Sequence, residues 1–243
     1  DRSGNDENLL VWYSDEDSRY KLASINYQTG KVKKLITDQV IKSNFAWSKD
    51  NRYGLYFVIR EGYWDRDLYV YDFTTGEKKL LIPHHGWMNN VVWGEKGEFA
   101  FFTKDGKICR LELQAKEDYW DEEDNWTPIL ADKEKEEKAE KDAEKDKDEE
   151  RGEKKEEAKP VKIDFENIDK RVFDLVSRPG YNKVVATITD SMIYYLNELS
   201  EPSPSGWKRK YTMRKVNYKG KKDEEFYKFS AEPDDLVYNE ENK

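Results

Sequence analysis

Residues 67–82 read DLYVYDFTTGEKKLLI, and residues 21–36 read KLASINYQTGKVKKLI. Each stretch has a run of alternating apolar and polar residues, then a Thr-Gly pair, then a second short run. The alternation predicts β-strands, and Gly30 and Gly76 supply the backbone freedom that a tight hairpin turn requires. The two glycines lie 46 positions apart (76 − 30), so the sequence predicts a repeated hairpin.

A second pair of segments keeps the same period. Residues 44–58 read NFAWSKDNRYGLYFV and residues 90–103 read NVVWGEKGEFAFFT, with Trp47 and Trp93 also 46 positions apart (93 − 47). Each segment has apolar residues, a Trp, a polar turn and an aromatic strand. A four-stranded unit that repeats about every 40–50 residues is typical of a β-propeller blade.

The strands of a blade are labelled A to D from the propeller axis outward. Three blades then have the predicted strands 44–47, 54–59, 67–73 and 78–82; 90–93, 98–103, 107–113 and 170–176; and 182–189, 191–197, 211–218 and 224–230. Residues 8–15 fit strand B of an earlier blade whose strand A is absent, and residues 234–240 would begin another blade. The sequence therefore predicts an all-β fold, a β-propeller fragment of roughly four four-stranded blades.

A charged tract separates strands C and D of the second of these blades. Residues 132–159 hold 14 acidic and 10 basic side chains and no aromatic or β-branched residue. Such a segment cannot build a core, so we expect a disordered insertion in one C–D loop. The predicted domains are residues 1–131 (first propeller part), 132–159 (charged insertion) and 160–243 (propeller continued). Because neighbouring strands are antiparallel, C–D and A–B loops should share one face, and B–C and D–A loops the other.

The composition excludes several classes of protein. The formal net charge is −9, and the chain outside the charged tract is acidic as well, which argues against a nucleic-acid partner. No apolar run approaches the ~20 residues of a membrane-spanning helix. One cysteine, Cys109, rules out an internal disulfide or a thiolate metal cluster, and its place on an alternating strand predicts a small buried residue.

The order of segments after the second blade resembles a known family. KICRLEL is followed by a Lys/Glu tract, by KPVKIDFENIDKRVFDL and by YNKVVATITDSMIYYL (residues 107–113, 159–175 and 181–196). This order is similar to the second propeller of tricorn-like serine peptidases, family S41. The pattern V-x-I-D-x-x-x-I-x-x-R of those proteins is matched by Val161, Ile163, Asp164, Ile168 and Arg171. The units WSKDNRY…LYF and LYVYDFTTGEKKLL also resemble TolB-like propeller repeats.

The resemblance implies a non-catalytic part of a peptide-degrading protease, which acts as a substrate filter or channel. Its partners would be peptide substrates and the rest of a larger protease chain. Neither a PDZ-like GLGF nor a catalytic Ser segment occurs in the 243 residues, so no catalytic residue, metal ligand or cofactor is assigned. The resemblance favours a periplasmic or secreted location and leaves a cytoplasmic one open, as it does homo-oligomer formation.

Two other functions stay open at this point. A TolB-like propeller would bind a protein partner and have no enzymatic activity. The propeller lid of a prolyl-oligopeptidase-type hydrolase would require an α/β-hydrolase domain with a G-x-S-x-G motif, which these residues lack.

Two loops on the B–C and D–A face carry the candidate contact residues. IPHHGWMNN (82–90) joins strand D to strand A, and REGYWDRD (60–67) joins strands B and C. We expect Tyr63, Trp64, His85 and Trp87 to line a channel rim that contacts peptides. The alternative is that Trp64 and Trp87 pack between adjacent blades.

Two further segments carry structural expectations. Arg171 should pair with Asp164, Glu166 or Asp169 and fix the return from the insertion into strand D. SEPSPSGWKRK (200–210), rich in Pro, Ser and Gly, should form a long loop between strands B and C and could contact a partner.

Overall fold

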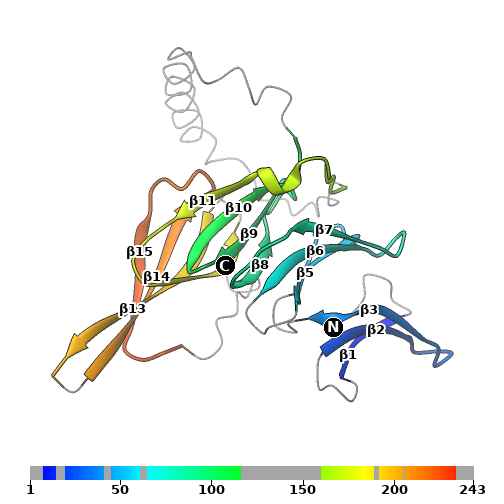
Figure 1. Cartoon of the computed structure of the whole chain (residues 1–243), viewed down its shortest axis with the longest axis horizontal. Helices are drawn as coiled ribbons and strands as arrows, with labels where there is room; N and C mark the ends of the chain where they lie inside the picture. Colours follow the sequence, from blue (N-terminus) through cyan, green and yellow to red (C-terminus); the bar gives the residue numbers. More distant parts are fainter. Residues whose placement is uncertain are drawn as a thin grey trace, which may run out of the picture. The chain divides into compact units, whose positions relative to one another are not determined.

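The computed structural model describes residues 8–14, 20–40, 45–60, 65–115, 160–188, 192–204 and 206–233 (Figure 1). One compact unit spans Asp1–Gln114 and Lys159–Lys243, and a second spans Ala115–Ala158, of which only Ala115 is described. The predicted disorder of residues 132–159 and the predicted strand at 234–240 therefore lie outside the described residues. The predicted domain boundaries remain predictions.

The strands follow one another as the repeat predicts, and all paired neighbours are antiparallel. Blade 1 has β1 (Asn8–Ser14), β2 (Tyr20–Asn26) and β3 (Val32–Val40), and blade 2 has β4 (Ala46–Trp47), β5 (Tyr53–Ile59), β6 (Arg66–Asp72) and β7 (Glu77–Ile82). Blade 3 has β8 (Met88–Trp93), β9 (Phe99–Lys104), β10 (Lys107–Glu112) and β11 (Val172–Val176), and blade 4 has β12 (Tyr181–Ile188), β13 (Met192–Ser203), β14 (Gly206–Asn217) and β15 (Glu224–Phe229). These sheets confirm the predicted β-propeller fragment of roughly four blades.

One pairing between blades 1 and 2 goes beyond the sequence pattern, whereas the turn glycines behave as predicted. Val40 at the end of β3 pairs with Val58 of β5, so the two blades share a seven-stranded sheet. The turn residues Gly30 and Gly76 have φ of 68° and 75°, the left-handed conformation that glycine adopts without steric cost. In the part of the chain that the structure describes, no helix is long and apolar enough to cross a membrane.

Strand D of blade 3 is contributed from beyond the charged tract. Arg110 and Leu111 of β10 lie opposite Phe173 and Val172 of β11 in an antiparallel pair. Cys109 is fully buried, as expected, and lies opposite Asp174. The tract is therefore an insertion between strands C and D, as predicted.

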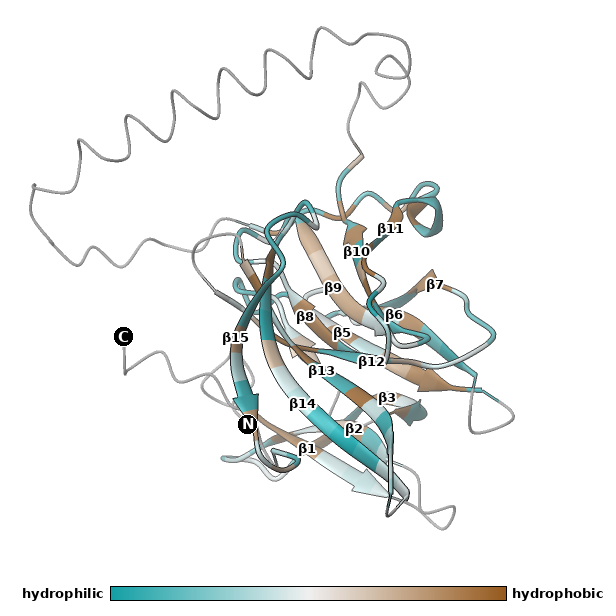
Figure 2. Ribbon diagram, turned by 90° about the vertical axis from the view of Figure 1, so that its left-hand side faces the viewer, coloured by the Kyte–Doolittle hydropathy of each residue, from teal (hydrophilic) through white to brown (hydrophobic). Residues whose placement is uncertain are grey.

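The hydrophobic core is divided into clusters that lie between successive blades. Between blades 1 and 2 the buried residues are Leu10, Leu22, Ile36, Val40, Tyr56 and Tyr71. Between blades 2 and 3 they include Leu55, Phe57, Leu68, Met88, Trp93 and Phe102. Between blades 3 and 4 they include Phe101, Ile108, Val184, Ile193, Tyr195 and Val216. Figure 2 shows the corresponding hydrophobic colour along β9 and the hydrophilic end of β14. Each sheet thus buries a face against its neighbour, as stacked sheets do.

The segment that returns from the insertion is anchored to two blades. Val161, Ile163 and Ile168 are buried in the cluster between blades 2 and 3. The Val161 N–H donates to Asp50 Oδ2 at 2.7 Å in the A–B turn of blade 2. A Cβ atom added to Gly97, in the A–B turn of blade 3, would lie 2.6 Å from Val161 Cγ2. The start of the return segment therefore lies on the face that carries the A–B turns.

The prediction that Arg171 pairs with an acidic side chain is wrong. Arg171 is buried, and its Nη2 donates to the main-chain carbonyl of Asp164. Its own carbonyl accepts the Glu112 N–H at 3.0 Å. Arg171 does fix the return into β11, but it does so through a carbonyl oxygen, because the chain folds back through the 3₁₀ turn η2 (Ile168–Lys170).

The prediction of a long loop at residues 200–210 is also wrong. β13 runs to Ser203 and β14 starts at Gly206, with Pro202 opposite Trp207. Residues 199–203 and 206–210 extend past the last pairs with β12 and β15 and form a two-stranded arm. The Pro/Ser/Gly composition indicates a loop, but cross-strand pairing continues through it. Trp207 on this arm is 75% exposed.

Substitution of Trp93 tests the inter-blade packing. Trp93 is buried, and its indole N–H donates to the Ala46 carbonyl of the preceding blade at 2.8 Å. Trp47 stacks on Phe73 with ring centroids 4.3 Å apart.

We expect Trp93→Ala to lower the free energy of unfolding by about 3–5 kcal/mol. Trp47→Ala should cost less, because Trp47 is only partly buried. Urea unfolding of both variants measures this, and Trp207→Ala is the control, expected within about 0.5 kcal/mol. Equal effects at Trp93 and Trp207 would contradict the repeat alignment.

Acid unfolding tests the contact between Asp50 and the return segment. Burial acts to raise the pKa of the Asp50 carboxyl, but hydrogen bonds from the Ser48 hydroxyl and the Val161 N–H outweigh it and lower the pKa. A lowered folded-state pKa contributes stability that is present above the unfolded pKa of about 3.9 and is lost as the pH falls through the folded pKa. Asp50→Asn should therefore be less stable at neutral pH and lose less stability between about pH 5 and pH 3. Parallel pH profiles of the variant and the parent protein would argue against this contact.

Replacement of residues 132–159 by a short Gly/Ser linker tests the insertion. Because β10 and β11 already pair as neighbours, the linker changes only the entropy of loop closure, which depends weakly on length. The free energy of unfolding should change by less than about 1 kcal/mol. Thermal and urea unfolding measure it, and loss of cooperative unfolding would show that the tract supports the propeller.

Candidate functional site

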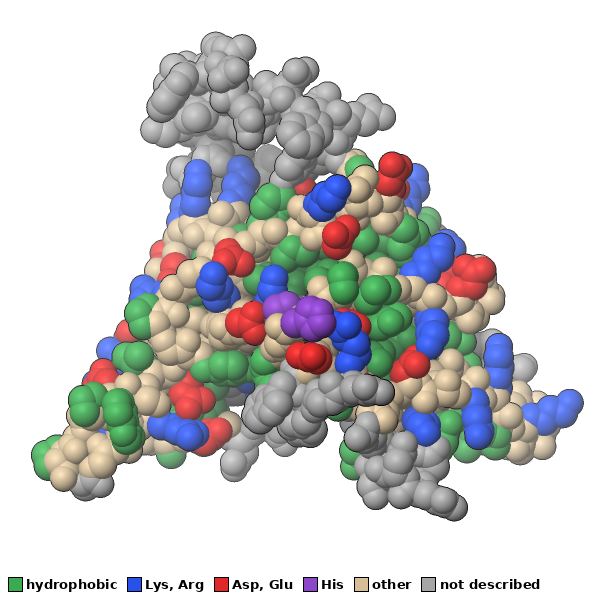
Figure 3. All heavy atoms as spheres, in the orientation of Figure 1, with side chains coloured by type: hydrophobic (Ala, Val, Ile, Leu, Met, Phe, Trp, Pro, Cys, Tyr) green, Lys and Arg blue, Asp and Glu red, His purple; other side chains and the backbone are tan. Residues whose placement is uncertain are grey.

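The loop between β7 and β8, residues 83–87, is the centre of the candidate site. It carries His84 and His85, the two histidines of the chain, which Figure 3 shows in purple among acidic and basic side chains. The neighbouring residues come from the B–C connection of blade 2 and from the B–C turn of blade 3 at Asp105. Contacts among these segments place the D–A loop and the B–C connections together.

His84 fixes the loop through its main chain and its side chain. Its N–H donates to Asp67 Oδ1 at 2.8 Å, and its carbonyl accepts from Arg60 Nη2 at 2.8 Å. The Nε2 atom lies 3.0 Å from Asp105 Oδ2, an ion pair when the imidazole is protonated. His84 therefore links the B–C connections of blades 2 and 3.

Asp67 and Arg60 form the ion pair that supports this loop. Arg60 Nη2 lies 2.9 Å from Asp67 Oδ1, and the Asp67 carboxylate is almost completely buried. The same carboxylate oxygen accepts the His84 N–H. A buried carboxylate is stabilised only when charged or N–H partners surround it, and here both kinds are present.

Trp87 is held between blades 2 and 3. The guanidinium carbon of Arg66 lies 3.4 Å from the centroid of the Trp87 ring, a close cation–π contact. Arg66 Nη1 also donates to the Met88 carbonyl at 3.1 Å. The main-chain N–H of Trp87 donates to Asp105 Oδ1 at 3.1 Å. The main-chain carbonyl of Trp87 accepts the Asp105 N–H at 2.9 Å. These contacts fix the orientation of the indole.

His85 points to solvent. Its side chain is 85% exposed, and Nδ1 lies 3.6 Å from Asp65 Oδ2. The expected residues Tyr63 and Trp64 lie outside the described residues. Of the four candidate contact residues, the structure therefore places His85 and Trp87, two residues apart in one loop.

The site combines an exposed imidazole, an oriented indole, carboxylates and guanidinium groups. Such a surface can hydrogen-bond main-chain amides and carbonyls and pack against apolar side chains. Among the described residues, no group of three or more His, Cys, Asp or Glu side chains could hold a metal ion.

Sequence reasoning missed the residues that support the loop. Arg60, Arg66, Asp67 and Asp105 all contact residues 84–88. The alternating charges in REGYWDRD were a signal, because buried or half-buried Arg and Asp side chains require partners. Asp105 carried a weaker signal, as the first residue of an Asp-Gly turn.

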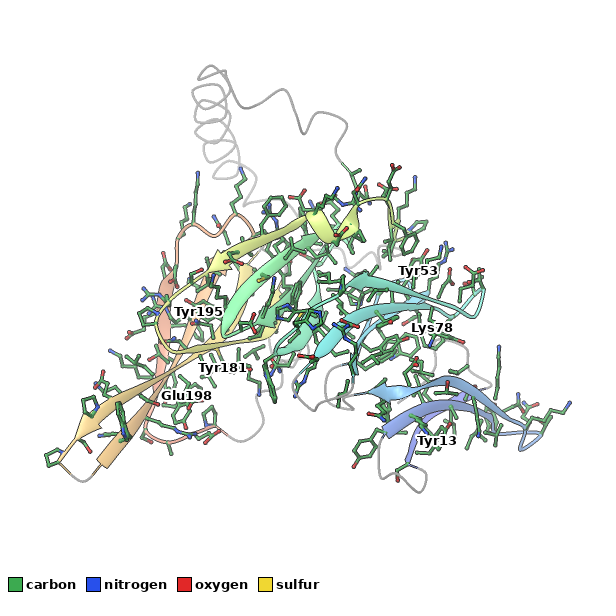
Figure 4. The ribbon with its side chains drawn as sticks, in the orientation of Figure 1. Tyr13, Tyr53, Lys78, Tyr181, Tyr195 and Glu198 are labelled. Carbon is green, nitrogen blue, oxygen red and sulfur yellow. The ribbon has the colours of Figure 1, made fainter. Side chains whose placement is uncertain are left out.

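A second polar cluster lies within blade 4. The Tyr195 hydroxyl donates to Asp223 Oδ1 at 2.7 Å, Arg214 Nε donates to the same atom at 2.9 Å, and Arg178 pairs with Asp223 Oδ2. Burial acts to raise the pKa of Asp223, but the bonds from Arg178, Tyr195 and Arg214 lower it overall. Figure 4 labels Tyr195 in the body of β13 and Glu198 farther toward the arm. With every oxygen of Asp223 engaged, the cluster stabilises the turn before β15.

Comparison with known proteins shows the fold. No protein-family profile and no curated protein sequence matches the chain. The structure is similar to the tricorn protease, with a TM-score of 0.57 and 12% identity over 92% of this chain and 21% of that one. It is also similar to a protein assigned as TolB from Agrobacterium tumefaciens, with a TM-score of 0.54 and 10% identity over 93% of this chain and 63% of that one. The structure is similar as well to an oligogalacturonate lyase in complex with manganese, with a TM-score of 0.52 and 11% identity over 94% of this chain and 52% of that one.

These similarities define a class of protein by fold alone. The chain spans less than two thirds of each of these three structures. It contains a β-propeller region of the kind found in larger proteins. Their activities are not transferred by a likeness at such low identity.

Substitution of Asp67 tests the support of the loop. Asp67→Ala leaves the His84 N–H and the Arg60 guanidinium without their acceptor, so we expect unfolding to become easier by about 1–3 kcal/mol. Asp38→Ala is the matched control, because the Asp38–Lys78 pair is partly exposed and should contribute less than about 1 kcal/mol. Chemical unfolding compares the two, and equal losses would show that the loop does not depend on Asp67.

Proposed function

We propose that this chain is the non-catalytic β-propeller part of a tricorn-like serine peptidase. In this role it filters or channels peptide substrates toward a catalytic domain elsewhere in a larger protein. Two findings support the proposal: the fold likeness to the tricorn protease over 92% of this chain, and the segment that matches V-x-I-D-x-x-x-I-x-x-R. An extracytoplasmic location belongs to the same proposal.

The observation that carries the proposal is the fixed loop at residues 83–87. His85 is presented to solvent while His84 and Trp87 are bound on both sides to neighbouring blades. A rim that contacts passing peptides must be rigid, because ordering a mobile loop on binding weakens affinity. The loop also joins the two blades, so it lies where a peptide would meet more than one of them.

The residues of this loop would bind and orient a peptide without breaking a bond. The His85 imidazole can accept or donate a hydrogen bond to a main-chain amide. The Trp87 indole supplies apolar contact area at low cost in side-chain entropy, and Arg66 keeps it in place. Tyr63 and Trp64, three and two positions before Arg66 in the sequence, belong to the same proposal.

Binding of fluorescent peptides tests the proposal. Anisotropy should report binding of unstructured peptides to the full chain, weakened about tenfold by the double substitution His85→Ala and Trp87→Ala, a loss of about 1.4 kcal/mol. Tyr27→Ala is the control, because Tyr27 is exposed in the C–D hairpin turn of blade 1. Absence of binding, or equal affinities of the double variant and the control, would contradict a peptide-contacting rim.

The likeness to TolB supports a second candidate, a propeller that docks a folded protein partner and has no enzymatic role. The coding sequence of the whole protein separates the two. A PDZ domain and a Ser/His catalytic domain in the same reading frame support the peptidase, and a propeller without a catalytic domain supports the TolB-like module.

A further inference from the structure

The arm formed by residues 199–203 and 206–210 has two free strand edges. The pairing of β12 with β13 reaches Glu198, and the pairing of β15 with β14 starts at Tyr211, so both neighbouring strands stop at the base of the arm (Figure 1). Because these neighbours are part of blade 4 itself, the free edges do not depend on any further blade. A free strand edge presents main-chain N–H and C=O groups with which an added strand can pair.

The register of the arm decides which main-chain groups point outward. Ser203 lies opposite Gly206, and only two residues separate them, so they form the hydrogen-bonded closing pair of a hairpin. Hydrogen-bonded and non-hydrogen-bonded pairs alternate along an antiparallel ladder, so the N–H groups of Trp207 and Arg209 point to the free edge of β14. Opposite Trp207, on the edge of β13, lies Pro202, which has no N–H. The edge of β13 is therefore blunted, and the edge of β14 is open.

The open edge is basic in an acidic chain. Residues 208–210 of β14 are Lys208, Arg209 and Lys210, whereas the whole chain has a formal net charge of −9. Arg209 lies 3.3 Å from a carboxylate oxygen of Glu198, and Lys210 lies 2.5 Å from one of Glu201. Both cationic side chains still remain more than half exposed. Two carboxylates for three cations leave the arm with excess positive charge.

This charge selects the strand that could pair with the open edge. A second copy that paired through the same edge would set basic residues opposite basic residues, which destabilises a strand pair, whereas acidic residues would be favoured there. Lys208 and Lys210 lie on one face of the arm, and Trp207 and Arg209 lie on the other, because side chains alternate along a strand. Trp207 is 75% exposed. The strand that fits best therefore has acidic side chains at alternate positions and apolar side chains between them.

The base of the arm is joined to the candidate site. The buried Asn182 donates from Nδ2 to the Gly106 carbonyl at 2.8 Å, and its Oδ1 accepts from Nδ2 of Asn197 in β13 at 2.9 Å. Asp105, the neighbour of Gly106, binds the main chain of the loop at residues 83–87. The arm and the candidate site therefore lie on the same face of the propeller, the one that carries the B–C and D–A connections.

We propose that the open edge of β14 in the arm binds an extended acidic peptide by β-strand addition. The main-chain N–H and C=O groups of Trp207 and Arg209 pair with the main chain of the peptide, and Lys208 and Lys210 face its carboxylates. The proposal rests on the proposed function in taking peptides as ligands. It adds a substrate class, extended segments with acidic residues at alternate positions.

Two matched fluorescent peptides test the preference for acidic strands, one of alternating Glu and Val and one of alternating Lys and Val. Anisotropy with the full chain at low ionic strength should show that the Glu/Val peptide binds about tenfold or more tightly than the Lys/Val peptide. The double substitution Lys208→Gln and Lys210→Gln should remove most of this difference, because it removes the cations that face the carboxylates.

A pair of substitutions at position 209 tests the main-chain pairing. Arg209→Pro and Arg209→Ala both remove the guanidinium, but only proline also removes the outward N–H. Proline is tolerated in an edge strand where the N–H faces solvent, so the arm should keep its pairing with β13. The Glu/Val peptide should bind Arg209→Pro about tenfold or more weakly than Arg209→Ala. Matching circular dichroism melts show that both variants are folded.

Three results would overturn the proposal. Equal affinity of the proline and alanine variants would mean that charge alone holds the peptide. Equal binding of the Glu/Val and Lys/Val peptides to the parent chain, or no binding of the Glu/Val peptide, would remove the acidic ligand. The double variant His85→Ala and Trp87→Ala separates this proposal from the proposed function. Peptide binding that this variant weakens and the arm variants leave unchanged contradicts only the arm, and the reverse pattern contradicts only the rim.

Discussion

The antiparallel pairing of β10 with β11 is the interaction on which the rest of the structure depends. It closes blade 3 across the charged insertion, and it positions the chain that leads into β12 and blade 4. Because the partner strands are spatial neighbours, the insertion costs little in closure entropy, whatever its composition. Without this pair, β10 would be the outer edge strand of blade 3, and the chain that leads into β12 would lose its pairing with that blade.

The return segment makes this pairing specific. Val161 and Ile168 fill the space between blades 2 and 3, and Asp50 binds the Val161 N–H from the turn of the preceding blade. The same two blades support the loop of His84 and Trp87 on the opposite face. A single inter-blade cluster therefore connects the return segment to the candidate site at residues 83–87. The motif that resembles tricorn-like peptidases has a structural role in this chain.

Much of the fold was predictable because the blades of a propeller repeat the same residue types at the same positions. The turn glycines and Trp47 and Trp93 recur at one period, and strand order then placed residues 83–87 in a D–A loop. The arm at residues 199–210 was not predictable, because its Pro/Ser/Gly composition is typical of a loop while the pairing depends on backbone geometry. The support of the candidate site by Asp67 and Asp105 was missed for a related reason. These contacts join residues 17 or more positions apart, so the local charge pattern indicates that partners are needed but does not say which residues they are.

The most direct test of the central claim uses the one native cysteine. Cys109 of β10 lies opposite Asp174 of β11, and residues directly opposite in an antiparallel pair have Cα atoms about 4.5–5.5 Å apart, within the range of a disulfide. Asp174→Cys should give an intramolecular disulfide on mild oxidation, detected by mass spectrometry of proteolytic fragments, while Asp169→Cys in the exposed turn should not. A folded Asp174→Cys variant that forms no such bond, or a bond that forms equally well from position 169, would contradict the closure of blade 3 across the insertion.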